Sequence, residues 1–446
     1  MVPVGQSRRS DWDHTMSRTE KARVMSAATP AVQDICDSYV YLLGRLLVLR
    51  QEHLEFMHKP FAWNTVVHSE AGGPTWTDHL DIAYSEAWIA VDDHTCTLIE
   101  VPDLRGRYYT IQLVNPWGET IANINERTYP HHPSGAFLIS SKRTRVTLPR
   151  DTDTLRIDLP GRKARMLLHL EHGVDRAEAL ALQRQIRVRA TGRPVIAAPV
   201  AIPMFTNDAL PGVEAFDIAP EVLESEPDSN PDTDILQAKV HTVARAAAAG
   251  LAERERIDHV IHDQVWTALG KEMGAMDMFR NGWVRPRFAG SYDGDWIMRT
   301  VGNLRNAWTN THEEVVSFRN GTVLPLSGDD TYMLRFSESD LPSSHVKYFW
   351  SVSCADTADG PVNALERRPL LNQRSNLQYD DDGSLTLYFA PQRPQDAPDE
   401  NWLQTPAGRQ YVLTWRAYGP DRVTVSGHWF PPRLEKMRPA LLRRVR

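Results

Sequence analysis

Three side chains near the start of the sequence could together transfer protons. They are His58, Asp81 and Tyr84, which supply an imidazole, a carboxyl group and a phenol. Burial and mutual pairing can move the pKa values of such groups toward neutrality, so that acid–base chemistry proceeds without a metal ion. The alternative is a structural network, in which Asp81 caps a turn and Tyr84 packs beneath a sheet.

A fourth candidate, Arg107, begins the segment RYYTIQLV at residues 107–114, which is rich in strong β-formers. Alternation along a strand places Arg107 with Tyr109 on one face and Tyr108 with Gln112 on the other. The planar guanidinium of Arg107 could hold a carboxylate or phosphate through two hydrogen bonds. The alternative is an ion pair that joins this strand to a neighbour. We expect one face to complete a core and the other to line a pocket.

Helices and strands can be placed from the hydrophobic periodicity. Thr29 and Pro30 mark the start of a helix that buries one face, because apolar residues recur from Val32 to Leu49 at steps of three and four. Short strands separated by Asp, Gly and Pro turns follow from about residue 84 to 170 and favour an antiparallel sheet. Further helices are expected at about 175–188, 234–249, 252–273 and 295–316, and a second set of strands after them.

The overall composition is that of a soluble globular protein. The chain has 446 residues, 41% hydrophobic and 24% charged, with a formal net charge of −7. This charge gives no reason to expect a nucleic-acid partner, and no segment has the roughly 20 apolar residues of a membrane helix. We therefore predict a cytoplasmic protein whose partner is a small molecule, with homo-oligomerisation left open.

Known cofactor motifs do not occur in the sequence. Cys36, Cys96 and Cys354 are far apart and lack the spacing of a zinc site or a disulfide framework. His259 and His262 are more typical of a surface helix than of a ligand pair. The chain has no P-loop, no GxGxxG fingerprint and no GxSxG elbow. The prediction is an absence of metal and of cofactor.

Several longer segments resemble a bacterial family. DIAYSEAWIAV and LIEVPDLRGRYYTIQLVNPWGETIANINERT are similar to domain of unknown function 1254, and YMLRFSESDLPSSHVKYFWSVSCAD and VSGHWFPP are similar to its usual companion, domain of unknown function 1214. The resemblance extends over roughly residues 30 to 435. It implies an α+β fold with an N-terminal helix, a meandering antiparallel sheet, middle helices and a C-terminal β jelly-roll sandwich.

Motif positions of this family select the candidate site. The resemblance makes His58, Asp81, Tyr84 and Arg107 the expected catalytic residues. The expected substrate-binding residues are Tyr109, Gln112, Trp117, Trp350, Arg367, Trp402 and Arg416. The chain departs from the motif at Leu80, at Glu86 and at 353–356, close to the expected pocket, so its substrate or activity can differ from that of a typical member.

The expected domain organisation has five parts. They are a disordered leader at 1–28, an N-terminal α+β domain at 29–195, a linker and helical segment at 196–310, a C-terminal jelly-roll domain at 311–435 and a basic tail at 436–446. The segment 194–231 is rich in Pro and acidic residues, and ESEPDSNPDTD at 224–234 is the best linker candidate.

Three functions are compatible with these residues. The first is a cofactor-independent enzyme that hydrolyses, eliminates or isomerises a small, partly apolar molecule by acid–base chemistry. The second is a non-catalytic protein that binds a small molecule or carbohydrate with Trp350, Trp402 and Arg416 on the jelly-roll face. The third is a structural module that assembles through a flat sheet face. The fold alone does not choose among them.

Overall fold

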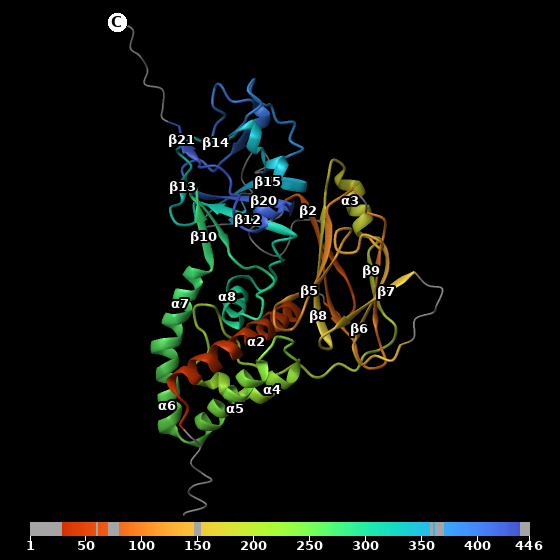
Figure 1. Ribbon diagram of the computed structural model, residues 1–446, viewed down its shortest axis with the longest axis vertical. Helices are drawn as coiled ribbons and strands as arrows, with labels where there is room; N and C mark the ends of the chain where they lie inside the picture. The colour runs from red at the N-terminus through yellow and green to blue at the C-terminus, as the bar shows by residue number, and fades with distance from the viewer. Residues whose placement is uncertain are drawn as a thin grey trace, which may run out of the picture.

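The computed structural model describes residues 29–58, 61–69, 80–104, 106–146, 153–356, 360–361 and 370–437. The predicted leader, Arg367 and most of the predicted basic tail lie outside these ranges. Figure 1 shows two β-rich units above and beside a layer of helices. The expected α+β class with several sheets is confirmed. Among the described residues, every helix is too short or too polar to cross a membrane.

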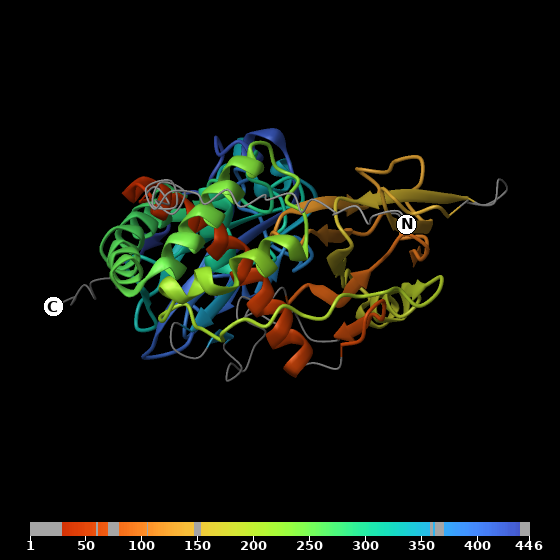
Figure 2. The ribbon, with the colours of Figure 1, turned by 90° about the horizontal axis from the view of Figure 1, so that it is seen from below.

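The first helix, α2 (Val32–His58), lies at the centre of the helical layer (Figure 2). Its middle turns are buried on nearly all sides, because α4 (Ala219–Ser225), α5 (Thr233–Ala249) and α8 (Trp296–Asn306) pack around it. Figure 1 shows α2 between α8 above it and α4 and α5 below it. Near its C-terminal end Glu52 and Glu55 are also buried, where they meet the side chains of a strand described below.

The N-terminal unit is made of two sheets with a shared apolar core. One sheet has the order β1-β2-β8-β4-β5 and the other has the order β7-β6-β3-β9, with β6 and β7 parallel. Their bounds are β1 Val67–Ser69, β2 Ile82–Ala90, β3 Thr97–Val101, β4 Tyr109–Val114, β5 Thr120–Ile124, β6 Gly135–Ser141, β7 Thr154–Leu159, β8 Lys163–Glu171 and β9 Arg187–Ala190. Tyr109, Ile111 and Leu113 of β4 point into this core. One face of the β4 strand therefore completes a core, as predicted.

Helix α3 (Arg176–Gln183) packs against β2 and β8, and Asp175 caps its first turn through Glu178 N. The middle of the chain then forms α4 and α5 and a longer helical run. That run consists of α6 (Leu251–Val260), a π-helical turn (Ile261–Val265) and α7 (Trp266–Ala275). Gly250 separates α5 from α6, where the sequence predicts an end.

The C-terminal unit is a two-sheet sandwich. The larger sheet has the order β10-β11-β12-β20-β15-β16, and in it β13 also pairs with β20 and β17 with β15. The smaller sheet has the order β19-β18-β14-β21. Their bounds are β10 Asp277–Arg280, β11 Trp283–Pro286, β12 Val315–Asn320, β13 Leu326–Ser327, β14 Tyr332–Phe336, β15 Val346–Asp356, β16 Gly360–Pro361, β17 Leu370–Asn372, β18 Leu385–Ala390, β19 Trp402–Gln404, β20 Gln410–Pro420 and β21 Glu435–Lys436. β10 and β11 belong to this sheet although they precede residue 311.

An apolar contact joins the two β-rich units. Tyr108, from the second face of the β4 strand, packs edge-on against Tyr418 with ring centroids 5.0 Å apart, and Phe349 stacks on Tyr418 at 4.2 Å. Beside these rings, Arg127 forms an ion pair with buried Glu314. The second face of this strand therefore meets the other unit.

Candidate functional site

Asp81 and Tyr84 lie at the start of β2, and both are buried. The Asp81 carboxylate accepts a hydrogen bond from Asn372 Nδ2 at 2.7 Å, and its backbone carbonyl accepts one from His172 N. The Tyr84 ring packs against the His169 ring with centroids 4.6 Å apart. Burial raises the pKa of Tyr84 above its ordinary value and lowers the pKa of His169 to about 4.

Arg107 fastens the end of β8. Its Nη1 donates to the backbone carbonyls of Glu171 at 3.0 Å and His172 at 2.7 Å, and its Nη2 forms a 2.7 Å ion pair with Glu178 of α3. Asp81 and Arg107 therefore lie on either side of the same short segment. His58 is the last residue of α2 and is exposed, and among the described residues no hydrogen bond or ion pair joins it to the other three.

The second unit completes a partly buried polar cluster around Asp81. Arg374 forms an ion pair with Glu171 at 2.6 Å, and the phenol of Tyr418 lies close to Ser351. Burial raises the pKa of Tyr418, Arg416 lowers it and Asp81 raises it, which places both charges near this phenol. We call Asp81, Glu171, Asn372, Arg374 and Tyr418 the inter-unit network. Its geometry holds the two units together.

Two other predicted binding residues, Tyr109 and Gln112, are held by hydrogen bonds to neighbouring segments. The Tyr109 hydroxyl donates to the carbonyl of Pro133, and Gln112 donates to Thr120 Oγ1 at 2.8 Å and to the Thr309 carbonyl at 3.2 Å. Tyr109 and Gln112 are fully or almost fully buried. These contacts are typical of structural residues.

The predicted binding residues of the second unit lie in or against its core. Trp350 stacks on Trp415 at 4.4 Å inside the sandwich, and Trp402 Nε1 donates to the Ala390 carbonyl at 2.9 Å. Arg416 is 2% exposed, and its Nη1 donates to Ser353 Oγ at 3.1 Å. Trp350 and Arg416 are thus buried and do not form an exposed platform together.

Trp117 contacts a residue that lines a cleft outside the inter-unit network. It is fully buried, and its indole N–H donates to the backbone carbonyl of Glu226 at 3.2 Å. Glu226 lines a cleft of about 770 Å³ between the N-terminal sheets and the helical layer. One wall is formed by the ends of β2 and β6 and the β7–β8 turn, and the other by the end of α4 and the start of α5. The extended residues 195–197 border the cleft.

The carboxyl group of Glu226 fits against the β7–β8 turn. Its Oε2 accepts a hydrogen bond from Arg162 N at 2.9 Å. A Cβ on Gly161 would lie 2.2 Å from Oε2, so only glycine leaves room for the carboxyl group there. Glu226 is 4% exposed, and burial raises its pKa above the ordinary 4.5, although Arg45 and Lys163 lower it in part.

Two other charges that line the cleft are compensated. Lys163 Nζ forms an ion pair with buried Glu52 at 3.0 Å. The Asp228 carboxylate accepts hydrogen bonds from Arg299 at 3.0 and 2.7 Å and from the Tyr41 hydroxyl at 3.0 Å. Glu226, by contrast, is held by a backbone N–H. The cleft therefore combines a buried carboxyl group of raised pKa with a neighbouring ammonium group.

Sequence reasoning did not select Glu226, Lys163 or Gly161. Glu226 lies in the Pro-rich acidic stretch, where composition favours a solvated linker. The one available signal was Trp117, which the structure connects to Glu226. Within the described ranges, no group of three His, Cys, Asp or Glu side chains is arranged to hold a metal ion.

Removal of the Asp81 carboxylate is expected to weaken the inter-unit network. Asp81→Ala would leave the half-buried Asn372 amide without this charged acceptor, at a cost of about 1–3 kcal/mol in the free energy of unfolding. Urea unfolding of Asp81→Ala, Asn372→Ala and the double variant gives the coupling energy. Asp208→Ala, at an exposed position, is the control. Costs that simply add in the double variant would contradict a direct Asp81–Asn372 interaction.

A side chain at residue 161 is expected to displace the Glu226 carboxyl group from its position against the β7–β8 turn. Gly161→Ala should lower the free energy of unfolding by about 1–3 kcal/mol, the usual cost of overpacking. Gly270→Ala is the matched control, because a Cβ there meets no atom within 4 Å, and alanine favours its helix. Equal stability of Gly161→Ala and the wild-type protein would show that the carboxyl group does not depend on this close approach.

Comparisons with known proteins agree with the fold. A crystal structure of the VPA0106 protein from Vibrio parahaemolyticus is similar over 91% of this chain and 100% of that chain, with 17% identity and a TM-score of 0.70. An uncharacterised protein from Burkholderia cenocepacia is 14% identical over 94% of this chain and 93% of its own, with a TM-score of 0.42. A comparison with curated proteins found no match. The first similarity shows a shared fold.

Family comparisons identify both β-rich units. Residues 63–190 match the family described as "Protein of unknown function (DUF1254)". Residues 316–422 match the family described as "Protein of unknown function (DUF1214)". The order and position of the two matches are those expected from the sequence motifs. The chain therefore carries, in this order, a region that matches domain of unknown function 1254 and a region that matches domain of unknown function 1214.

Proposed function

We propose that the protein is an enzyme that acts on a small, partly apolar molecule by acid–base chemistry in the cleft, with Glu226 as general acid. The observation that carries this proposal is the buried Glu226 carboxyl group of raised pKa on the wall of a cleft of about 770 Å³. Pockets of this size hold small molecules, and perturbed carboxyl groups in them are typical of catalytic sites.

Hydrogen bonding suggests which oxygen carries the proton. Oε2 accepts from Arg162 N, so the proton of the neutral carboxyl group belongs on Oε1. From Oε1 it can pass to an oxygen or nitrogen of the substrate as a bond breaks or a double bond moves. Such a step is common to hydrolysis, elimination and isomerisation. Lys163 and Ser225 also line the cleft, but the Lys163 ammonium group is paired with Glu52 and the Ser225 hydroxyl donates to the Val222 carbonyl.

The two other functions receive less support. A carbohydrate platform of Trp350, Trp402 and Arg416 would need exposed side chains, whereas Trp350 and Arg416 are buried. Exposed apolar residues such as Phe279 and Leu324 do occur, but nothing in the structure indicates what they would contact. Homo-oligomerisation therefore stays a prediction. The proposed cytoplasmic location is supported by Cys36, Cys96 and Cys354, which remain thiols in the structure.

Glu226→Gln is the direct test of catalysis. Wild-type protein and the variant would be incubated with a mixed extract of small metabolites, and compound loss would be followed by mass spectrometry. The variant should consume the same compounds at least about 100-fold more slowly, because glutamine cannot donate the proton. Asp208→Asn serves as control. Equal consumption by Glu226→Gln, or no consumption by the wild type, would refute the proposal.

Stability against pH tests the state of the carboxyl group itself. Because the pKa of Glu226 is raised on folding, the folded protein binds its proton more tightly than the unfolded chain. Stability contributed by the neutral form is present at low pH and is lost as the pH rises above about 4.5, until the folded pKa is passed. Glu226→Gln should therefore become more stable relative to wild type across that range. A pH-independent difference would argue against a raised pKa.

A further inference from the structure

The two walls of the cleft carry opposite charges at its rim. On the sheet side, Lys142 and Arg143 follow β6 and Arg162 lies in the β7–β8 turn. On the helix side, Glu224 lies in the last turn of α4 and Asp234 in the first turn of α5. All five side chains line the cleft and belong to exposed residues. The cleft thus has a cationic wall facing an acidic wall.

These rim charges are not used to close the cleft. Among the described residues, no ion pair joins the sheet wall to the helix wall, and the Arg162 guanidinium pairs with Asp93 of its own wall, at 3.5 Å. Deeper in the cleft, Lys163 and Asp228 already have buried partners. The charges left to meet a ligand are therefore those of the rim.

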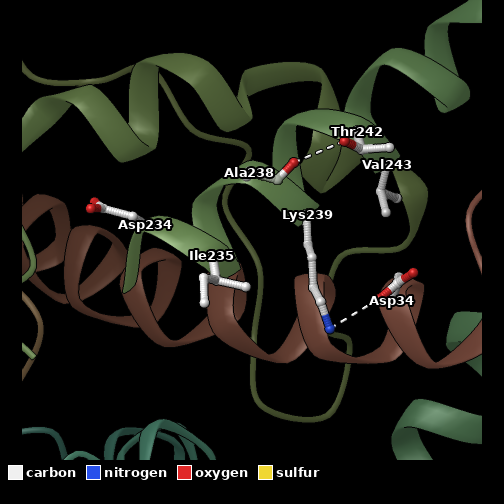
Figure 3. Close-up of a pocket in the computed structure, with 7 residues that line it drawn as sticks. All are labelled: Asp34, Asp234, Ile235, Ala238, Lys239, Thr242 and Val243. Atoms are coloured by element: carbon white, nitrogen blue, oxygen red, sulfur yellow. Dashed lines mark hydrogen bonds and ion pairs between the residues drawn. The ribbon is translucent and has the colours of Figure 1, made fainter. Parts of the chain in front are cut away.

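A neighbouring groove of about 470 Å³ shows the contrasting case. It lies between α2 and α5, where Lys239 forms an ion pair with Asp34 at 2.9 Å (Figure 3). Lys239 also pairs with Asp37 at 2.8 Å. The Lys239 ammonium group of this groove is paired with both carboxylates. Figure 3 also shows Asp234 directed away from Lys239. Asp234 is therefore available to the cleft.

We propose that the cleft takes a small zwitterion, with a carboxylate against the sheet wall and an ammonium group against the helix wall. A purely anionic ligand would face Glu224 and Asp234, and a purely cationic one would face Arg143. Only a molecule with both charges is complementary to both walls. Ile196 and Leu223 also line the cleft and match an apolar body. This assignment rests on the function proposed for the same cleft.

Three probes of equal length test it: 5-aminopentanoate, pentanoate and pentylamine. Binding would be measured by calorimetry at neutral pH and low salt. The zwitterion should bind about fivefold more tightly than either single-charge analogue, the effect of one additional exposed ion pair. Arg143→Ala should remove the advantage over pentylamine without changing pentylamine binding, and Asp234→Asn should remove the advantage over pentanoate without changing pentanoate binding. Lys271→Ala, an exposed cation outside the cleft, is the control.

Glu226→Gln separates this inference from the proposed function. If the variant loses turnover while the zwitterion shows no advantage, the substrate class is wrong and the catalytic role stands. If the zwitterion advantage is present and depends on Arg143 and Asp234 while turnover survives in Glu226→Gln, the catalytic role is wrong and the ligand class stands. Equal binding of all three probes, or an advantage that neither rim substitution reduces, would overturn the inference.

Discussion

The attachment of the end of α4 to the N-terminal sheets is the interaction on which the cleft depends. The indole of Trp117 holds the Glu226 carbonyl, the Arg162 N–H holds its carboxyl group, and fully buried Arg45 of α2 donates to Ser225 Oγ at 3.0 Å. The Arg162 N–H and the charges of Arg45 and Lys163 favour the charged form of Glu226, but burial outweighs them and raises its pKa. The contacts that close the fold act on the acid through this burial.

The inter-unit network has a different role. Asp81, Tyr84 and Arg107 do gather near the end of β8, but their hydrogen-bond partners are backbone groups and side chains that join strands, α3 and the second unit. A motif residue can be needed because it connects two units, without ever touching a substrate. In this protein the family motif marks the contact between the domain of unknown function 1254 and its companion, and the cleft lies elsewhere.

Much of the fold could be predicted because its signals are local. Pro30 before α2, Gly250 after α5 and the alternation of Tyr108 and Tyr109 each act within a few residues. The cleft could not be predicted, since Glu226 meets Arg162 and Trp117 across 64 and 109 residues. Composition was misleading because an acidic, Pro-rich stretch with no tertiary partners is expected to be solvated. Here Arg299 forms an ion pair with Asp228, and the Glu226 carboxyl group packs against the β7–β8 turn. Arg299 and the β7–β8 turn are both distant in the sequence from Asp228 and Glu226.

The most direct measurement is the pKa of Glu226 in the folded protein. A carbon-13 NMR titration of the glutamate carboxyl carbons, with the Glu226 signal assigned by its loss in Glu226→Gln, reads this value without reference to any substrate. The account predicts a midpoint above 4.5, the ordinary value for a glutamate. A midpoint at or below 4.5 would show that the cleft does not disfavour the charged form of Glu226. Glu226 would then not be the general acid.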